Sequence, residues 1–247
     1  MKEVKTMENR KTTLQKLVTL SMLVAIGVVI SPILRVEGMC PMAHLINVVC
    51  AVLLGPWYSL LCAFLIGIIR MTLMGIPPLA LTGAVFGAFL SGMLYRFSKG
   101  NLIFAVIGEV MGTGIIGAIV SYPVMTFIWN REGLSWLFYI PSFITATLIG
   151  GSIAYVFLKQ LSKIRMLVKM QKALGSAAYE SNDSVLSDSL GIAALGVIGY
   201  LVILIVVKLI LSISTGWALF LPYIPLTGLI ITAIVYFVIK QSKISKD

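Results

Sequence analysis

Charged residues are scarce in this chain. They account for 11% of its 247 residues, and only nine of them are acidic. A soluble protein of this length needs a much larger charged surface. Hydrophobic residues make up 59% of the chain, and the mean hydropathy is +1.04. These values exclude an ordinary soluble domain and place the chain among membrane proteins.

Histidine and cysteine are also rare. The only histidine, His44, excludes a metal site built from several imidazoles. Three cysteines, Cys40, Cys50 and Cys62, fit neither a set of disulfides nor a paired metal motif. Cys50 and Cys62 lie in apolar segments, where we expect them to pack helices together. We therefore expect no metal and no cofactor.

The common catalytic motifs are absent from the sequence. There is no G-x-x-x-x-G-K-[ST] run, so the chain does not itself bind and hydrolyse ATP. It also lacks H-E-x-x-H, G-x-S-x-G and a pair of acids suited to proteolysis within the membrane. A membrane-embedded hydrolase would need a paired nucleophile and base, and none is recognisable. The sequence does not favour an enzyme.

Long apolar segments dominate what is present. Eight can be distinguished, at about 14–34, 43–55, 57–74, 79–95, 102–122, 135–158, 190–212 and 217–239. All except the second and fourth approach or exceed the ~20 residues of a membrane-spanning helix. The second ends at Gly55-Pro56, which predicts a short or tilted helix followed by a tight turn, and Ile76-Pro77-Pro78 predicts another turn. The first has no cleavage site behind it and is expected to be retained. The pattern predicts an all-α, polytopic membrane protein.

Basic residues are distributed unevenly between the two sides that these segments define. If the segments alternate, 15 of the 19 fall on one side: Lys2, Lys5, Arg10, Lys11, Lys16, Arg96, Lys99, Lys159, Lys163, Arg165, Lys169, Lys172, Lys240, Lys243 and Lys246. The other four are Arg35, Arg70, Arg131 and Lys208. Such an excess marks cytoplasmic loops, so both termini are predicted to be cytoplasmic. The same placement argues against nucleic acid as the partner of a chain with charge +10.

The composition divides the chain into a compact unit and later additions. A cytoplasmic tail, 1–13, precedes a six-helix membrane domain at 14–159, whose short connections favour antiparallel neighbours. Residues 160–189 combine a basic amphipathic segment, expected on the inner leaflet, with a polar linker. A further transmembrane hairpin at 190–240 and a cytoplasmic tail at 241–247 complete the chain. No internal repeat is recognisable, which weakens the case for an inverted-repeat carrier.

Five polar residues within the apolar segments are the candidate substrate-binding residues: His44, Asn47, Arg70, Glu109 and Thr113. Polar groups at membrane depth are costly, and they persist mainly where they face a cavity, a partner or a ligand. His44 and Asn47 are three residues apart and share a helix face. An imidazole and an amide together suit a small, polar, uncharged heterocycle. A site with one acid and one base also fits a neutral ligand.

Glu109 lies in the most unusual segment, 108–117, whose glycines allow neighbouring helices to approach closely. Glu109, Thr113, Gly117 and Ser121 recur every four residues. This spacing predicts one stripe of small and polar side chains, which we expect to face the interior of the bundle.

Alternatives remain open for these residues. Glu109 can form a structural ion pair, with Arg70 as the obvious partner. At ~1.5 Å per residue, however, Arg70 lies about 20 Å from the inner face and Glu109 only about 10 Å, so contact is not assured. Arg70 can instead extend to the outer headgroups, while Asn47 bridges helices and His44 meets headgroups. The outer aromatic residues fit an interfacial belt, from which one or two can stack on a flat ligand: Tyr122, Trp129, Trp136 and Tyr139.

With these motifs in view, about the first 160 residues resemble the ThiW family. The resemblance rests on Cys40-Pro41-x-x-His44-x-x-Asn47, Leu53-Leu54-Gly55-Pro56-Trp57-Tyr58, Gly67-x-x-Arg70, Gly108-Glu109-x-x-Gly112-Thr113-Gly114-x-x-Gly117 and Tyr122-Pro123. It implies a six-helix S component, the substrate-binding subunit of an energy-coupling factor (ECF) transporter. The ligand implied is a thiamine precursor, hydroxyethylthiazole in particular. The partners implied are a transmembrane coupling protein and two cytoplasmic ATPases.

The first helix of this family docks the coupling protein through a small-x-x-x-small face, commonly with alanine at both positions. Here the best candidate is Ser21-x-x-x-Ala25, which retains the close approach but adds a hydroxyl. Residues from about 160 to 247 lie outside the resemblance.

Two functions follow from the sequence. The first is a substrate-capturing subunit in the plasma membrane, energised by separate ATPases. The alternative is a proton-coupled secondary carrier of a small heterocycle that uses Glu109 as its protonatable group. A pH gradient alone would drive the second and not the first.

Overall fold

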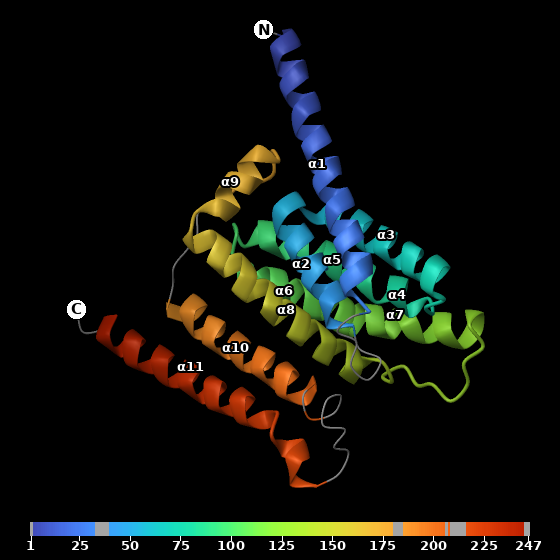
Figure 1. The fold of residues 1–247 in the computed structure, drawn as a ribbon, viewed down its shortest axis with the longest axis vertical. Helices are drawn as coiled ribbons and strands as arrows, with labels where there is room; N and C mark the ends of the chain where they lie inside the picture. Colours follow the sequence, from blue (N-terminus) through green and yellow to red (C-terminus); the bar gives the residue numbers. More distant parts are fainter. Residues whose placement is uncertain (1, 33–39, 180–184, 206, 208–215, 245–247) are drawn as a thin grey trace.

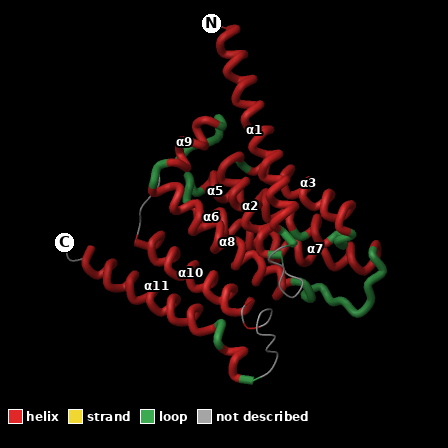
Figure 2. Tube along the Cα trace, in the orientation of Figure 1, coloured by secondary structure: helices red, strands yellow, loops and turns green. Residues whose placement is uncertain are grey.

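The computed structural model describes residues 2–32, 40–179, 185–205, 207 and 216–244. In these ranges all regular structure is helical, as Figure 2 shows. The elements are α1 (Lys2–Ile30), α2 (Pro41–Leu54), α3 (Pro56–Met74), α4 (Leu79–Thr82), α5 (Ala84–Phe97), α6 (Leu102–Glu109), the π-helix η1 (Val110–Gly117), α7 (Ala118–Pro123), the π-helix η2 (Val124–Ile128), α8 (Ile140–Lys163), α9 (Met166–Ala173), α10 (Val185–Ile205), the 3₁₀-helix η4 (Trp217–Phe220) and α11 (Tyr223–Ile244).

Seven helical stretches in the described ranges are long and apolar enough to cross a membrane: Arg10–Ile30, Pro56–Met74, Leu79–Phe97, Leu102–Ile128, Ile140–Lys163, Val185–Leu204 and Tyr223–Ser242. The prediction of an all-α polytopic membrane protein is confirmed. Figure 1 shows α2 to α8 as one bundle, with α1 extending beyond it and the pair α10–α11 lying along its side next to α8. Arg35 and Lys208, two of the four basic residues predicted on the less basic side, lie outside the described residues.

Helix α2 is the centre of this bundle, in contact with α1, α3, α5 and α8. All of its residues except Leu45 are buried, as expected for a helix that is apolar on every side. It ends at Gly55, whose φ of 90° allows Pro56 to begin α3 at once. The predicted short helix and tight turn are therefore confirmed.

The length of α2 leaves space at one end of the bundle. Its 14 residues rise about 21 Å, whereas the hydrocarbon core of a bilayer is about 30 Å thick. The neighbouring helices α3 and α8 have 19 and 24 residues. The end where α2 begins and α3 ends, here called the pocket end, is therefore not filled by the central helix.

Helices α5 and α6–η1 meet backbone to backbone. A Cβ on Gly108 would lie 2.6 Å from the carbonyl oxygen of Leu90, and a Cβ on Gly112 would lie 2.5 Å from the Cα of Gly87. One on Gly117 would lie 2.8 Å from the carbonyl oxygen of Gly83. These contacts leave no room for any larger residue, which explains the glycines at this seam.

The π-helix η1 keeps the polar stripe in line. Residues four apart drift around an α-helix, and the wider π turn offsets this drift. Glu109, Thr113, Gly117 and Ser121 are all buried, and Ser121 Oγ lies 2.7 Å from Thr82 Oγ1. The predicted stripe faces the bundle interior. The π-helical turns were not predicted.

Helix α9, which follows the bundle, folds back onto its core. Gln171 is fully buried, and its Nε2 donates to the carbonyl oxygen of Val52 at 2.9 Å and to Tyr95 Oη at 3.0 Å. Ser176 Oγ donates to the next carbonyl, that of Leu53, at 2.6 Å. These two side chains satisfy carbonyls in the last turn of α2, which has no intrahelical partners for them. The amphipathic segment expected at the membrane surface thus also caps the central helix.

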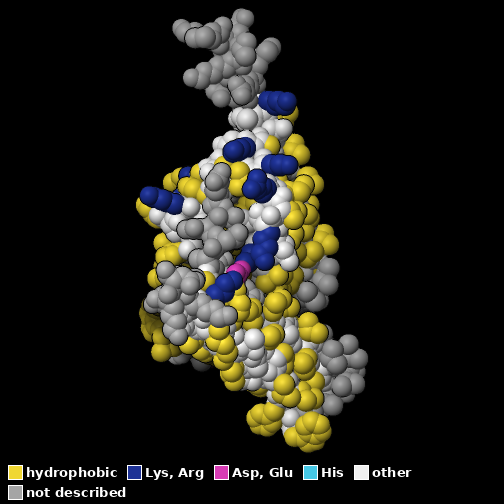
Figure 3. Space-filling model, turned by 90° about the vertical axis from the view of Figure 1, so that its left-hand side faces the viewer, with side chains coloured by type: hydrophobic (Ala, Val, Ile, Leu, Met, Phe, Trp, Pro, Cys, Tyr) yellow, Lys and Arg dark blue, Asp and Glu magenta, His cyan; other side chains and the backbone are white. Residues whose placement is uncertain are grey.

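The hairpin of α10 and α11 attaches to α8 through a modest contact. Leu201 and Leu204 pack on Ile149, and Lys159 Nζ lies 2.9 Å from Asp188 Oδ1. Helix α11 is almost entirely exposed, with 6% of its apolar stretch buried. On the face shown in Figure 3, Lys and Arg gather toward the end where α1 and α9 lie, and the other end is largely hydrophobic.

Candidate functional site

The carboxylate of Glu109 is the centre of a buried hydrogen-bond cluster. Its Oε1 lies 2.8 Å from His44 Nδ1, 3.0 Å from Asn47 Nδ2 and 3.1 Å from Thr113 Oγ1. Glu109, Asn47 and Thr113 are 0–1% exposed and His44 is 8% exposed. Three donors that converge on one oxygen suit a carboxylate, because an ionised acid only accepts hydrogen bonds. Glu109 Oε2 has no partner among the described residues.

Local helix geometry assembles this cluster. His44 and Asn47 lie one turn apart on the same face of α2, and Thr113 lies one turn after Glu109. Asn47 Nδ2 also donates to the carbonyl oxygen of Ala84 at 3.3 Å, which ties α2 to α5. With Nδ1 directed at the carboxylate, a neutral His44 ring offers Nε2 as an acceptor. The ring is thereby oriented by groups on another helix.

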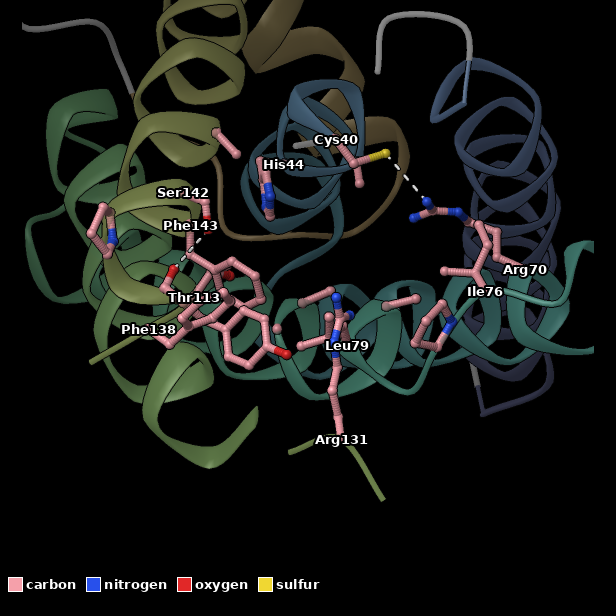
Figure 4. Close-up of a pocket in the computed structure, with 18 residues that line it drawn as sticks. Cys40, His44, Arg70, Ile76, Leu79, Thr113, Arg131, Phe138, Ser142 and Phe143 are labelled. Atoms are coloured by element: carbon pink, nitrogen blue, oxygen red, sulfur yellow. Dashed lines mark hydrogen bonds between the residues drawn. The ribbon is translucent and has the colours of Figure 1, made fainter. Parts of the chain in front are cut away.

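A cavity of about 540 Å³ lies at the pocket end, between α2, the α3–α4 turn, η1 and the segment leading into α8. Figure 4 shows its lining, which consists of Cys40, Ala43, His44, Arg70, Ile76, Pro77, Leu79, Ala80, Gly83, Ala84, Thr113, Arg131, Phe138, Tyr139, Pro141, Ser142, Phe143 and Ala146. Cavities of about 300–1,000 Å³ are typical of sites for small molecules. The turn predicted at Ile76-Pro77-Pro78 contributes part of the wall.

Three of the five predicted residues, His44, Arg70 and Thr113, line this cavity. The other two do not line it: Glu109 bonds to His44 and Thr113 from behind, and Asn47 bonds to Glu109. The predicted set therefore forms a wall with a supporting layer rather than a single ring around a ligand.

Arg70 does not pair with Glu109. No ion pair joins them within the described part of the chain, and Arg70 Nη2 instead donates to Cys40 Sγ at 3.3 Å. The Nε atom of Arg70 is buried without a partner, and the residue is 5% exposed. The positions of Arg70 and Glu109 along their helices indicate different depths, which agrees with this separation. Arg70 lines the cavity and does not extend away from the bundle.

Aromatic side chains form the wall opposite α2. Of the four residues considered for stacking, only Tyr139 lines the cavity. Tyr122 and Trp136 stack on each other with ring centroids 4.4 Å apart, and Trp129 is half exposed. Phe138 and Phe143 were not predicted, although they flank Tyr139 at the start of an apolar segment.

Arg131 is the main residue that sequence reasoning missed. It was considered only as one of the charges on the less basic side, yet it lines the cavity beside Tyr139. Burial raises the pKa of Tyr139, and the charge of Arg131 opposes this increase. In Figure 4 the side chain of Arg131 extends from its loop toward the interior of the pocket. Arg131 lies in a polar loop, three residues after the π-helix η2 ends, and nothing in the sequence there indicated that its side chain lines a cavity.

The two small residues considered for docking are on an exposed face of α1. Ser21 and Ala25 are both exposed and lie one turn apart. Ser21 Oγ donates to the carbonyl oxygen of Leu17 at 3.0 Å, so its hydroxyl is satisfied within the helix. The face is therefore open to another helix.

The fold and the cavity together define a multi-pass membrane protein with a partly open pocket lined by apolar side chains and a few polar ones. The family model described as thiamine-precursor transporter protein (ThiW) matches residues 17–164, and the chain belongs to this family of transporters. The match runs from α1 to the end of α8, so α9, α10 and α11 lie beyond it. Comparison with curated proteins and with solved structures finds no significant match.

Proposed function

We propose that the chain is the substrate-capturing S component of an ECF importer and that it binds hydroxyethylthiazole from outside the cell. The observation that carries this proposal is the cavity at the pocket end, walled by His44, Arg70 and Thr113 and backed by Glu109. The family supplies the substrate class, a thiamine precursor. In this proposal the chain itself does not act as an enzyme.

The lining suits a small heteroaromatic alcohol. Phe138, Tyr139 and Phe143 offer ring faces on which a flat thiazole can stack. His44 Nε2 can accept the hydrogen bond of a hydroxyl, and Arg70 can donate to it. Glu109 holds His44 and Thr113 in place, Asn47 donates to Glu109, and neither Asn47 nor Glu109 lines the cavity.

The energy for import comes, in this proposal, from other subunits. A transmembrane coupling protein docks on the α1 face that contains Ser21 and Ala25, and two cytoplasmic ATPases drive the cycle. The chain lies in the plasma membrane with both termini in the cytoplasm, in keeping with the excess of Lys and Arg on that side.

Binding without the ATPases tests this function. Full-length protein in nanodiscs is titrated with hydroxyethylthiazole by calorimetry, and we expect saturable binding at one site. Glu109→Ala weakens it, because His44 and Thr113 lose the carboxylate that orients them, and Asn47→Ala weakens it because that carboxylate loses a donor. Thr147→Val serves as the control, since Thr147 is fully buried and outside the cavity lining. Unchanged affinity in both site variants would remove this site.

One observation favours a second function, a proton-coupled carrier. Glu109 Oε2 is buried without a partner among the described residues and can accept a proton. In liposomes that contain only this chain, a carrier accumulates ligand under a pH gradient, and Glu109→Gln abolishes the uptake. An S component shows binding but no uptake in the same vesicles.

A further inference from the structure

The cavity wall offers hydrogen-bond donors and positive charge without an acid. Its lining includes two arginines, Arg70 and Arg131, and no Asp or Glu from the described residues. Buried charges in proteins are normally paired, because leaving one unpaired in an apolar environment is costly. Of the two, Arg70 is buried and Arg131 is exposed, so Arg70 is the buried charge that lacks a counter-charge in this wall.

Arg70 carries the first part of this inference. It is 5% exposed, its Nε has no partner, and its one described side-chain bond goes to the thiol of Cys40. A thiol sulfur is a weak acceptor and provides no charge. A planar guanidinium in this state is suited to two parallel bonds with a carboxylate or phosphate.

Arg131 and Tyr139 carry the second part, from the other side of the cavity. Figure 4 shows Arg131 reaching into the pocket from its loop. Tyr139 lines the same space, and its hydroxyl is buried without a partner. Glu132, next to Arg131 in the chain, is exposed and does not line the cavity. Both walls thus present donors that lack acceptors.

Glu109 does not neutralise these groups. Its Oε1 accepts from His44, Asn47 and Thr113, its Oε2 has no partner among the described residues, and the carboxylate lies behind the wall that His44 and Thr113 form. A neutral alcohol would leave the two guanidinium charges as they are, whereas an oxyanion can meet both.

We propose that the pocket selects an anionic ligand, the phosphate monoester of the heteroaromatic alcohol, over the alcohol itself. This inference rests on the proposed function, because it takes the thiazole ring as the common part of both ligands. The phosphate lies between Arg70 and Arg131, with Tyr139 as an additional donor, and the ring packs on the aromatic wall. A phosphate monoester carries nearly two negative charges and three strong acceptor oxygens at neutral pH.

Competing titrations of the two compounds test the inference. Full-length protein in nanodiscs of neutral lipid is titrated with hydroxyethylthiazole and with its phosphate monoester at two salt concentrations. We expect the phosphate ester to bind at least ~10-fold more tightly, which is the gain in affinity that one charge-assisted hydrogen bond provides. Its affinity falls more steeply with salt than that of the alcohol.

Two variants assign the preference to the arginines. Arg70→Gln and Arg131→Gln each reduce the ratio of the two affinities toward one. Arg70→Gln also weakens binding of the alcohol, to which Arg70 can donate, but by less than it weakens binding of the ester. Arg131→Gln keeps the test valid if Arg70→Gln fails to fold, since Arg131 is exposed as a residue and its replacement leaves the packing unchanged. Arg10→Gln, an exposed arginine on α1 outside the cavity lining, leaves the ratio unchanged.

The outcomes separate this inference from the proposed function. Equal affinities, or tighter binding of the alcohol, overturn the anionic preference while the capture of a thiazole stands. A preference that survives both arginine variants also overturns it. Binding of neither compound overturns the inference and the proposed ligand together.

Discussion

Gly87 on α5 lies directly against the carboxylate of Glu109. A Cβ at position 87 would lie 2.8 Å from Glu109 Oε2, and it would lie closer still to Thr113 Oγ1. A residue without a side chain is thus part of the buried cluster, since it makes the space in which the acid and its hydroxyl partner meet.

Gly87→Ala therefore tests the cluster without removing any of its polar groups. The methyl group displaces Thr113 and Glu109, and we expect the free energy of unfolding to fall by about 1–3 kcal/mol, as for an overpacked core. Ligand affinity falls as well, because His44 loses its fixed partner. Thermal unfolding in detergent and calorimetric titration measure the two effects.

The matched control is Gly228→Ala on α11, where an added Cβ meets nothing within 4 Å. This change leaves affinity unaltered and favours the helix by roughly 1 kcal/mol. Equal behaviour of the two variants would contradict the contact between Gly87 and Glu109.

Thr113→Val separates the hydroxyl of Thr113 from its volume. The substitution removes one of three donors to Glu109 Oε1 in a fully buried setting, so we expect a loss of stability of about 1–3 kcal/mol. Thr147→Val is a suitable comparison, because Thr147 is equally buried and bonds only to the carbonyl oxygen of Ile144. A larger effect at position 147 than at 113 would argue against a special role for the cluster.

Gln171→Leu tests whether α9 caps the central helix. It leaves the carbonyl of Val52 and the hydroxyl of Tyr95 without their donor, which costs about 1–3 kcal/mol. The melting temperature falls, and limited proteolysis within residues 175–179 becomes faster. Lys169→Ala, an exposed position on the same helix, leaves both readouts unchanged. Slow cleavage in the Gln171→Leu protein would be evidence against the cap.

Removal of the terminal hairpin tests its relation to the site. A chain that ends after residue 179 keeps the whole family region and every residue that lines the cavity. It exposes Ile149 on α8, which lipid can cover in place of Leu201 and Leu204. We expect ligand affinity within about three-fold of the full chain, a difference below 1 kcal/mol. Loss of binding by a truncated protein that remains monodisperse would assign the hairpin a part in the site.

Patterns along the chain predicted the helices well because each pattern is local. Apolar runs, Gly55-Pro56 and the turn at 76–78 depend on neighbours in sequence, and all three correspond to features of the structure. The separation of Arg70 from Glu109 agrees with their different depths, which counting along two helices already indicates.

The contacts of the site were harder to predict because they join distant segments. Glu109 and His44 are 65 positions apart, and no local pattern links them. Charge alone favoured Arg70 as the partner of Glu109, whereas packing brought His44, Asn47 and Thr113 to it. Arg131 was overlooked because polar loops carry no periodicity from which the direction of a side chain follows.

The glycine seam between α5 and η1 has a consequence for how cargo is exchanged. Where Gly87 and Gly112 touch, no rotamer can swing aside, so that boundary is fixed in shape. The other side of the cavity is lined by Pro77 and Phe138, which lie in the segments between helices. We therefore expect a small molecule to enter and leave on the side of these connecting segments, because the glycine seam has no side chain that can move aside.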